Sequence, residues 1–130
     1  MPSPLILLVD DFADAREMYA DYLAFRGYRV TAAASGPAAV SLALSADRPN
    51  LILMDLQMHG MTGTEAMRLL REHPELACVP IVAFTAHALE GERLQALSDG
   101  FDAVIPKPCL PDDLVTLIDH YLSDRSTTPG

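Results

Sequence analysis

The sequence is poor in basic residues and in cysteine. Nine Lys and Arg residues stand against 18 Asp and Glu residues, so the formal net charge is −9. Because nucleic acids and anionic membranes recruit clusters of Lys and Arg, neither is expected as a direct partner. The two cysteines, Cys78 and Cys109, are too few for a disulfide framework or a metal knot. Both are expected to be ordinary reduced thiols, and the acidity favours a cation or a basic protein surface as partner.

Long hydrophobic runs are also missing. No apolar run reaches the roughly 18 residues of a membrane span, and no positively charged region precedes the short apolar stretch near the N-terminus. We therefore expect a cytoplasmic protein. Hydrophobic residues nevertheless make up 50% of the 130 residues. That content is enough for one domain to bury a core, and it excludes intrinsic disorder.

Short apolar runs alternate with segments of helical spacing. Continuous apolarity is typical of parallel strands covered on both faces, and strands are expected at Leu5–Val9, Tyr28–Ala33, Leu51–Met54, Ile81–Phe84 and Ala103–Ile105. Helices are expected at Ala15–Phe25, Pro37–Ala46, Thr64–Glu72, Leu89–Ser98 and Pro111–Leu122. Each strand and the helix after it fit one βα unit, and right-handed crossovers then predict an open α/β sheet with helices on both faces.

The positions of glycine and proline agree with a single domain. Glycines that we expect to take positive φ lie at the junctions, namely Gly27, Gly36, Gly63 and Gly100. Pro37 and Pro111 suit the first turns of helices. The predicted organisation is a lead of residues 1–4, a domain over residues 5–122 and a loose tail over residues 123–130.

Polar residues end the predicted strands, and in open α/β sheets ligands bind at that edge. These residues are Asp10, Asp11, Asp55, Thr85 and Lys107. Taken singly, each has an ordinary interpretation: an acid before a helix can cap it, a strand-end Thr is unremarkable, and a Lys is usually solvated.

Taken together, the five residues indicate phosphoryl chemistry. Three carboxylates at one edge repel one another and either hold a proton or bind a cation. Oxygen ligands without a His or Cys set favour Mg²⁺ over zinc. An Asp carboxylate is a nucleophile toward phosphoryl groups, and the metal, a hydroxyl and an ammonium can neutralise the charge on the transferring group.

Four ordered motifs resemble the receiver domains of response regulators in two-component signalling. They are L-L-V-D-D (Leu7–Asp11), L-I-L-M-D-L-Q-M (Leu51–Met58), F-T-A (Phe84–Ala86) and I-P-K-P (Ile105–Pro108). The resemblance covers about Leu5–Leu122 and is to the stand-alone type similar to the chemotaxis regulator. It implies a flavodoxin-like (βα)5 sandwich with a parallel sheet of order 2-1-3-4-5.

The resemblance also implies roles for individual residues. Asp55 is the expected phosphoacceptor, and Mg²⁺ is expected on Asp10, Asp11, Asp55 and the backbone carbonyl of Gln57, with Asp10 acting through water. The Thr85 hydroxyl is expected to move toward the acyl phosphate and Lys107 to pair with it. The Lys107–Pro108 bond is expected to be cis. Gln57 and His87 occupy positions that influence how long the phosphoryl group survives.

The partners follow from the same resemblance. A sensor histidine kinase or a histidine phosphotransfer protein is expected to supply the phosphoryl group. A downstream protein is expected to bind about Leu89–Leu122, where Gly91 lowers helix propensity. The length leaves room for the receiver and a short tail, so we expect the signal to pass to a separate protein by direct contact. The receiver is expected to act as a monomer or as a phosphorylation-linked dimer. No catalysis is expected beyond its own phosphorylation and dephosphorylation.

Two residues depart from the family pattern. Val104 stands where many receivers have an aromatic residue that moves with the threonine, and His59 replaces the proline of the common M-P-G turn. We do not interpret His59 as a phosphorelay histidine, since receivers accept from a histidine on another protein. The methionines nearby, Met54, Met58 and Met61, are expected to be packing and loop residues.

Three alternatives remain open. A pseudo-receiver would bind partners without being phosphorylated, although the complete set of five site residues argues against it. A Mg²⁺-dependent aspartyl-phosphate phosphatase commonly shows D-x-D-x-T after its first strand, where this chain has Asp10-Asp11-Phe12-Ala13-Asp14. A flavin-binding module would place hydroxyls and amides there, whereas carboxylates repel a cofactor phosphate.

Overall fold

The computed structural model describes residues 3–45, 47–86 and 88–127. Strands and helices alternate along them. The strands are β1 (Leu5–Val9), β2 (Arg29–Ala33), β3 (Leu51–Asp55), β4 (Ile81–Thr85) and β5 (Ala103–Pro106). The helices are α1 (Ala13–Phe25), α2 (Gly36–Ala43), α3 (Gly63–Arg71), α4 (Glu90–Asp99) and α5 (Pro111–Thr127), with a short 3₁₀ turn η1 (Pro74–Leu76) before β4.

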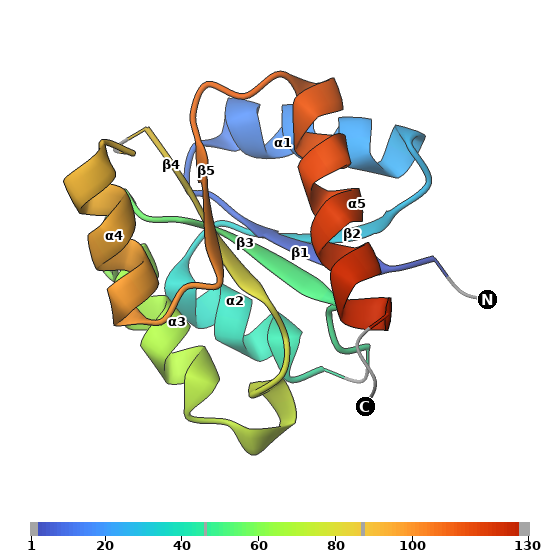
Figure 1. Ribbon diagram of the computed structural model, residues 1–130. Coiled ribbons are helices and arrows are strands. Elements are labelled where there is room, and N and C mark those ends of the chain that lie inside the picture. The colour runs from blue at the N-terminus through green and yellow to red at the C-terminus, as the bar shows by residue number, and fades with distance from the viewer. Residues whose placement is uncertain (1–2, 46, 87, 128–130) are drawn as a thin grey trace.

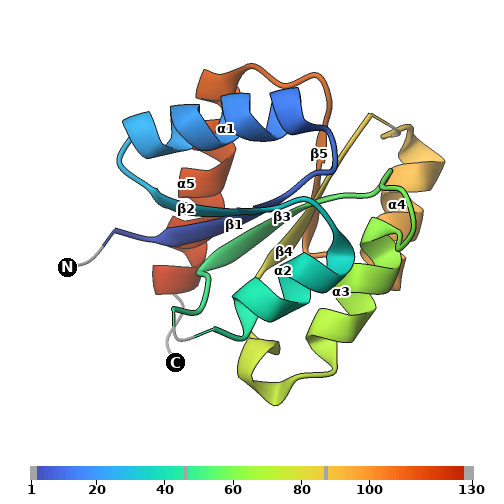
Figure 2. The same ribbon diagram turned by 180° about the vertical axis from the view of Figure 1, so that it is seen from behind.

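The five strands form one parallel sheet in the order β2-β1-β3-β4-β5. Helices α1 and α5 cover one face of the sheet, and α2, α3 and α4 cover the other (Figures 1 and 2). The predicted flavodoxin-like architecture and strand order are confirmed. No helix in the described part of the chain is long and apolar enough to cross a membrane.

Two hydrophobic cores explain the continuous apolar runs. Successive side chains of a strand point to opposite faces, so Ile6 and Leu8 of β1 pack under α1 and α5 while Leu7 and Val9 pack under the helices of the other face. The central strands β1, β3 and β4 are buried at every position. By contrast β2 is an edge strand in which only Ala33 is buried, which accounts for its weak sequence signal.

Some helix boundaries differ from the prediction. Helix α5 continues to Thr127, five residues beyond Leu122, so the expected loose tail at 123–127 is helical. Helix α2 ends at Ala43, since Leu44 already leaves the helix as its C-cap, and the predicted end at Ala46 lies outside the described residues. Apolar periodicity in the sequence locates the packed face of a helix, but a last turn made of polar residues carries no such signal.

The junction glycines serve two different purposes. Gly27 and Gly100 take the predicted positive φ, at +100° and +129°. For Gly36 and Gly63 the prediction is wrong, because only Gly27, Gly60 and Gly100 take positive φ among the described residues. These two glycines instead provide space: a Cβ on Gly63 would lie 2.2 Å from the carbonyl oxygen of Asp55. Helix α3 therefore starts directly against the end of β3.

Helix caps fix the loop that leaves β3. Thr62 Oγ1 accepts a hydrogen bond from the Glu65 N–H at 3.1 Å, and a Glu65 carboxylate oxygen accepts one from the Thr62 N–H at 3.1 Å. This reciprocal capping box sets the start of α3. Helix α1 begins after Phe12 with no side-chain cap. The interpretation of Asp10 or Asp11 as the cap of that helix is therefore wrong.

Candidate functional site

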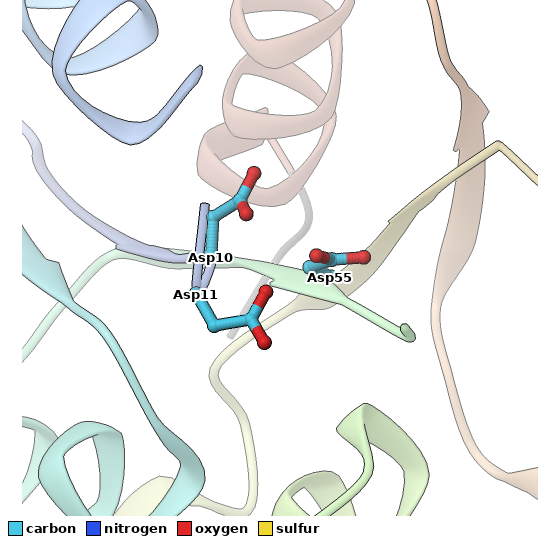
Figure 3. A group of neighbouring side chains, drawn as sticks. All are labelled: Asp10, Asp11 and Asp55. Atoms are coloured by element: carbon cyan, nitrogen blue, oxygen red, sulfur yellow. The ribbon is translucent and has the colours of Figure 1, made fainter. Parts of the chain in front are cut away.

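Three carboxylates meet at the carboxyl edge of the sheet. Val9 of β1 pairs in register with Met54 of β3, so the residues that follow, Asp10 and Asp55, emerge from neighbouring strands. One carboxylate oxygen from each of Asp10, Asp11 and Asp55 lies within 4.8 Å of the others. Figure 3 shows the three side chains at the ends of β1 and β3. The structure thus brings together the three acids that the sequence predicts at this edge.

Asp10 is the most buried of the three, with 1% of its surface exposed. Its Oδ1 accepts a hydrogen bond from the Phe12 N–H at 2.9 Å, and its Oδ2 accepts one from Lys107 Nζ at 2.9 Å. The backbone carbonyl of Asp10 accepts a further bond from the guanidinium of Arg16 at 2.8 Å. A buried carboxylate is stable only with such partners, so Asp10 is fixed in place.

Lys107 reaches the cluster from β5 on the far side of β4. Its Nζ lies 3.8 Å from Asp55 Oδ2, farther than from Asp10, and 4.9 Å from the centroid of the Phe84 ring. The Lys107 N–H donates to the Thr85 carbonyl at 2.8 Å, and the Lys107–Pro108 bond is cis, as predicted. One ammonium group is therefore within reach of two of the three acids.

Asp55 ends β3 with 6% of its surface exposed. Burial is the main cause that raises the pKa of Asp55, and the charge of Asp10 raises it further. The Gln57 N–H, which donates to Asp55 Oδ1 at 3.0 Å, and the Lys107 ammonium act in the opposite direction. The net effect is that the environment disfavours the negative charge of Asp55.

Asp11 lies at the open side of the cluster. Its Oδ2 accepts hydrogen bonds from the His59 N–H at 2.8 Å and from the His59 ring at 2.7 Å. The bond from the His59 backbone is the first cause that lowers the pKa of Asp11, followed by the bond from the ring. Asp11 therefore remains an anion to lower pH than an ordinary Asp.

Thr85 and Gln57 complete the set of predicted residues. Thr85 ends β4 fully buried and pairs with Pro106, the last residue of the adjacent strand β5. Lys107 follows Pro106 directly. Gln57 lies in the loop after β3, with its N–H bound to Asp55. His87 lies outside the described residues. The structure thus gathers the described members of the predicted set at one edge of the sheet.

Comparison with known proteins now identifies the family. The family described as response regulator receiver domain matches residues 6–119. The chain is a receiver domain. The polar-differentiation response regulator DivK of Brucella anthropi is 31% identical to it over 119 residues, which cover 92% of this chain and 96% of DivK.

Solved structures of receivers share the fold. The chemotaxis protein CheY4 of Vibrio cholerae gives a TM-score of 0.85 at 27% identity and covers 91% of this chain and 98% of its own. The receiver domain of the sensor histidine kinase PA1611 of Pseudomonas aeruginosa, which holds a magnesium ion in its active-site cleft, gives 0.83 at 33% identity, with 93% and 98% covered. The receiver fold and the two-component signalling class are thereby confirmed.

The residues that depart from the family pattern have clear positions in this receiver. Val104 is half-buried and packs against the core under α2, α3 and α4. Met54 and Met58 are buried in that same core and Met61 packs on it, so the interpretation of the methionines as packing residues is confirmed.

The two cysteines, Cys78 and Cys109, are free and form no disulfide with each other.

Some contacts of the site were beyond the sequence prediction. Tyr19 of α1 donates from its hydroxyl to the Cys109 carbonyl at 3.0 Å and packs edge-on against Phe84 with ring centroids 5.1 Å apart. Phe84 in turn lies under the Lys107 ammonium. An aromatic residue in a helix and another in a strand are typical of ordinary core positions, so no local signal ties them to the site.

Proposed function

We propose that this receiver accepts a phosphoryl group on Asp55 from a phosphorylated histidine of a partner kinase or phosphotransfer protein. One observation carries the proposal: Asp55 stands at the end of β3 with two other carboxylates within 4.8 Å and an ammonium nitrogen 3.8 Å from its Oδ2. This arrangement combines a nucleophile with groups that compensate the charge of a transferring phosphoryl group. The similar receiver of PA1611 holds a magnesium ion in its active-site cleft, which supports a cation at this cluster.

The donor set of the cluster fits Mg²⁺. Three carboxylate oxygens lie close enough to share one ion, and hard oxygen ligands without thiolates are those that Mg²⁺ prefers. Asp11, Asp55 and the backbone carbonyl of Gln57 would hold the ion, and Asp10 would act through water. When bound, Mg²⁺ supplies positive charge that offsets the three carboxylates and the oxygens of the phosphoryl group.

The chain's own residues divide the transfer step between them. A carboxylate oxygen of Asp55 forms the new P–O bond as the P–N bond to the donor imidazole breaks, and the departing imidazole keeps the electron pair and takes a proton from water. The Gln57 N–H holds Asp55 Oδ1 at 3.0 Å and so limits rotation of the carboxylate. Lys107 is placed to pair with the phosphoryl oxygens.

The switch that follows would use Thr85 and Lys107. Phosphorylation replaces the single negative charge of the Asp55 carboxylate with a phosphoryl group that carries about two negative charges, which favours movement of the Lys107 ammonium from Asp10 toward the phosphoryl group. The Thr85 hydroxyl would engage the phosphoryl group and draw the segment before α4 inward, which biases a two-state equilibrium. The expected output surface is about Leu89–Leu122, where Leu89, Leu94 and Leu110 are exposed.

The output of this receiver would be made by contact with a downstream protein, as a monomer or as a phosphorylation-linked dimer in the cytoplasm. Turnover would be limited to the receiver's own phosphorylation and dephosphorylation. A pseudo-receiver that binds partners without phosphorylation is the alternative that the experiment must separate.

Intact-mass spectrometry tests the proposal. The protein is incubated with Mg²⁺ and acetyl phosphate, or with a phosphorylated kinase, and wild type is compared with Asp55→Asn. We expect wild type to gain the mass of one phosphoryl group in a Mg²⁺-dependent manner and the variant to gain none. Equal gain in both proteins would mean that a residue other than Asp55 is phosphorylated and would contradict the proposal. No gain in wild type from either donor would contradict it too and would favour the pseudo-receiver.

A further inference from the structure

His59 makes two hydrogen bonds to a single oxygen of the acidic cluster. Its backbone N–H lies 2.8 Å and its ring Nδ1 lies 2.7 Å from Asp11 Oδ2. The imidazole is otherwise fully exposed, whereas the Asp11 side chain is only 20% exposed. An exposed histidine normally adopts several rotamers, so a ring held against a carboxylate at this distance indicates a specific contact.

The loop after β3 brings His59 to this position. Met58 is buried in the core, which anchors the residue before His59, and Gly60 takes a φ of +76°, which turns the chain immediately after it. The backbone N–H of His59 is thereby aimed at Asp11, and the ring folds back onto the same oxygen. A proline at this position would supply neither donor.

Each acid of the cluster has its own nitrogen donor. Gln57 holds Asp55 through Oδ1, Lys107 holds Asp10 through Oδ2, and His59 holds Asp11 through Oδ2. Because both His59 bonds fall on Oδ2 of Asp11, His59 itself does not occupy the other carboxylate oxygen, Oδ1. Among the described residues, the ligand atoms that lie within 4.8 Å of one another come from the three aspartates and include no His59 nitrogen.

We propose that His59 is a positioning residue of the cation site: it holds Asp11 by Oδ2 and turns the carboxylate so that the opposite oxygen is available to the ion. This inference rests on the proposed function, since it assumes that Mg²⁺ occupies the cluster. Partners of this kind set the orientation of ligating carboxylates and are typically worth about 10- to 100-fold in metal affinity. His59 is exposed, so we expect the lower end of that range.

The side chains of Asn and Gln provide a matched pair of variants. The amide nitrogen of Asn branches from Cγ at the same place as His Nδ1, whereas the amide nitrogen of Gln lies one bond farther out and matches Nε2 instead. His59→Asn therefore keeps a donor to Asp11 Oδ2 and His59→Gln does not. His59→Ala removes the ring but keeps the backbone N–H, and His59→Pro removes both donors.

Isothermal titration with Mg²⁺ at neutral pH tests the inference on these four variants. We expect His59→Ala and His59→Gln to weaken binding about tenfold, His59→Pro to weaken it more, and His59→Asn to remain within about threefold of wild type. Urea unfolding in the presence of chelator serves as the control, and the midpoint of His59→Ala is expected to match wild type.

Three results would overturn the inference. Wild-type Mg²⁺ affinity in His59→Ala would show that the ring does not position Asp11. If His59→Ala weakened the binding of Ni²⁺ and left the binding of Mg²⁺ unchanged, His59 would instead be a direct ligand of a bound transition metal. Absence of Mg²⁺ binding by wild type would overturn the proposed function together with this inference, so the two failures are distinguishable.

Discussion

At the scale of single residues, hydrogen-bond donors of the protein itself stabilise the negative charges of the three clustered carboxylates. Asp10 obtains its compensation from Lys107 and Asp11 obtains its from His59, while Asp55 is the member whose pKa is raised, first by burial and then by the charge of Asp10. The environment thus disfavours the negative charge of the residue proposed to accept the phosphoryl group.

Asp55→Asn is therefore expected to stabilise the protein in the absence of divalent ions. A carboxyl whose folded pKa is raised stabilises the fold fully below its unfolded pKa, and that contribution is lost as the pH rises through the folded value. At neutral pH the ionised Asp55 consequently costs stability. Unit charges about 5 Å apart repel by roughly 1 to 3 kcal/mol, and Lys107 offsets part of this repulsion.

We predict that Asp55→Asn raises the free energy of unfolding by about 1 kcal/mol at neutral pH, and that the difference from wild type shrinks as the pH falls through the raised pKa of Asp55. Urea unfolding in chelator at several pH values measures both effects. If the variant were less stable than wild type at neutral pH, the ionised Asp55 carboxylate would not destabilise the fold and the prediction would be wrong.

The sequence predicts the acids of the site but not all of their partners. Asp10 and Asp55 follow apolar runs, so their placement at strand ends depends only on the strand pattern. The contact of His59 with Asp11 spans 48 residues and depends on the path of a loop. No periodicity in the sequence specifies that path, which is why His59 can be identified as unusual but not placed.

At the scale of elements, the site depends on how closely α3 approaches the end of β3. The Gly63 N–H donates to the Leu56 carbonyl at 3.3 Å, and a Cβ on Gly63 would lie 2.2 Å from the Asp55 carbonyl oxygen and 2.8 Å from Leu56 Cα. These neighbours are backbone atoms and cannot rotate away. Any side chain at position 63 must therefore displace the strand end that carries Asp55.

Gly63→Ala is predicted to lower the free energy of unfolding by roughly 2 to 4 kcal/mol, as overpacking against rigid atoms does at its upper range. Gly91→Ala is the matched control, because Gly91 lies in α4 and a Cβ added there would meet no atom within 4 Å. The control is expected to gain about 0.5 kcal/mol from helix propensity. Chemical denaturation of both variants measures the contrast, and equal effects would refute the close-approach explanation.

Most of the secondary structure could be predicted from the sequence, for a physical reason. Buried central strands must be apolar on both faces, so β1, β3 and β4 appear as continuous runs. The roles of Gly36 and Gly63 could not be predicted, because crowding by a distant segment leaves no local trace. The extension of α5 to Thr127 could not be predicted either, since the polar sequence from Ser123 to Thr127 is compatible with helix or coil.

At the scale of the whole molecule, the acidity and the topology act together. The strand order β2-β1-β3-β4-β5 places β1, which leads into two acids, beside β3, which carries the third. A chain of formal net charge −9 thus concentrates part of its negative charge at one edge of the sheet. Removing that local repulsion with a cation should stabilise the entire fold.

Mg²⁺ is accordingly predicted to raise the melting temperature of wild type. At a concentration about ten times its Kd, a ligand specific for the folded state stabilises by about 1.4 kcal/mol, which corresponds to roughly 5 °C for a domain of this size. Thermal unfolding with and without Mg²⁺, at matched ionic strength, measures the shift. Asp11→Asn should abolish most of it, and an undiminished shift in that variant would remove Asp11 from the site.

The central claim is that Asp55 carries the phosphoryl group. Borohydride reduction of the phosphorylated protein followed by peptide mass spectrometry tests it most directly, because borohydride converts an aspartyl phosphate to homoserine and so marks the modified position. We predict homoserine at position 55 alone, formed only after incubation with Mg²⁺ and a phosphoryl donor. Homoserine at position 10 or 11, or at no position in protein incubated with an active phosphorylated kinase, would contradict the account.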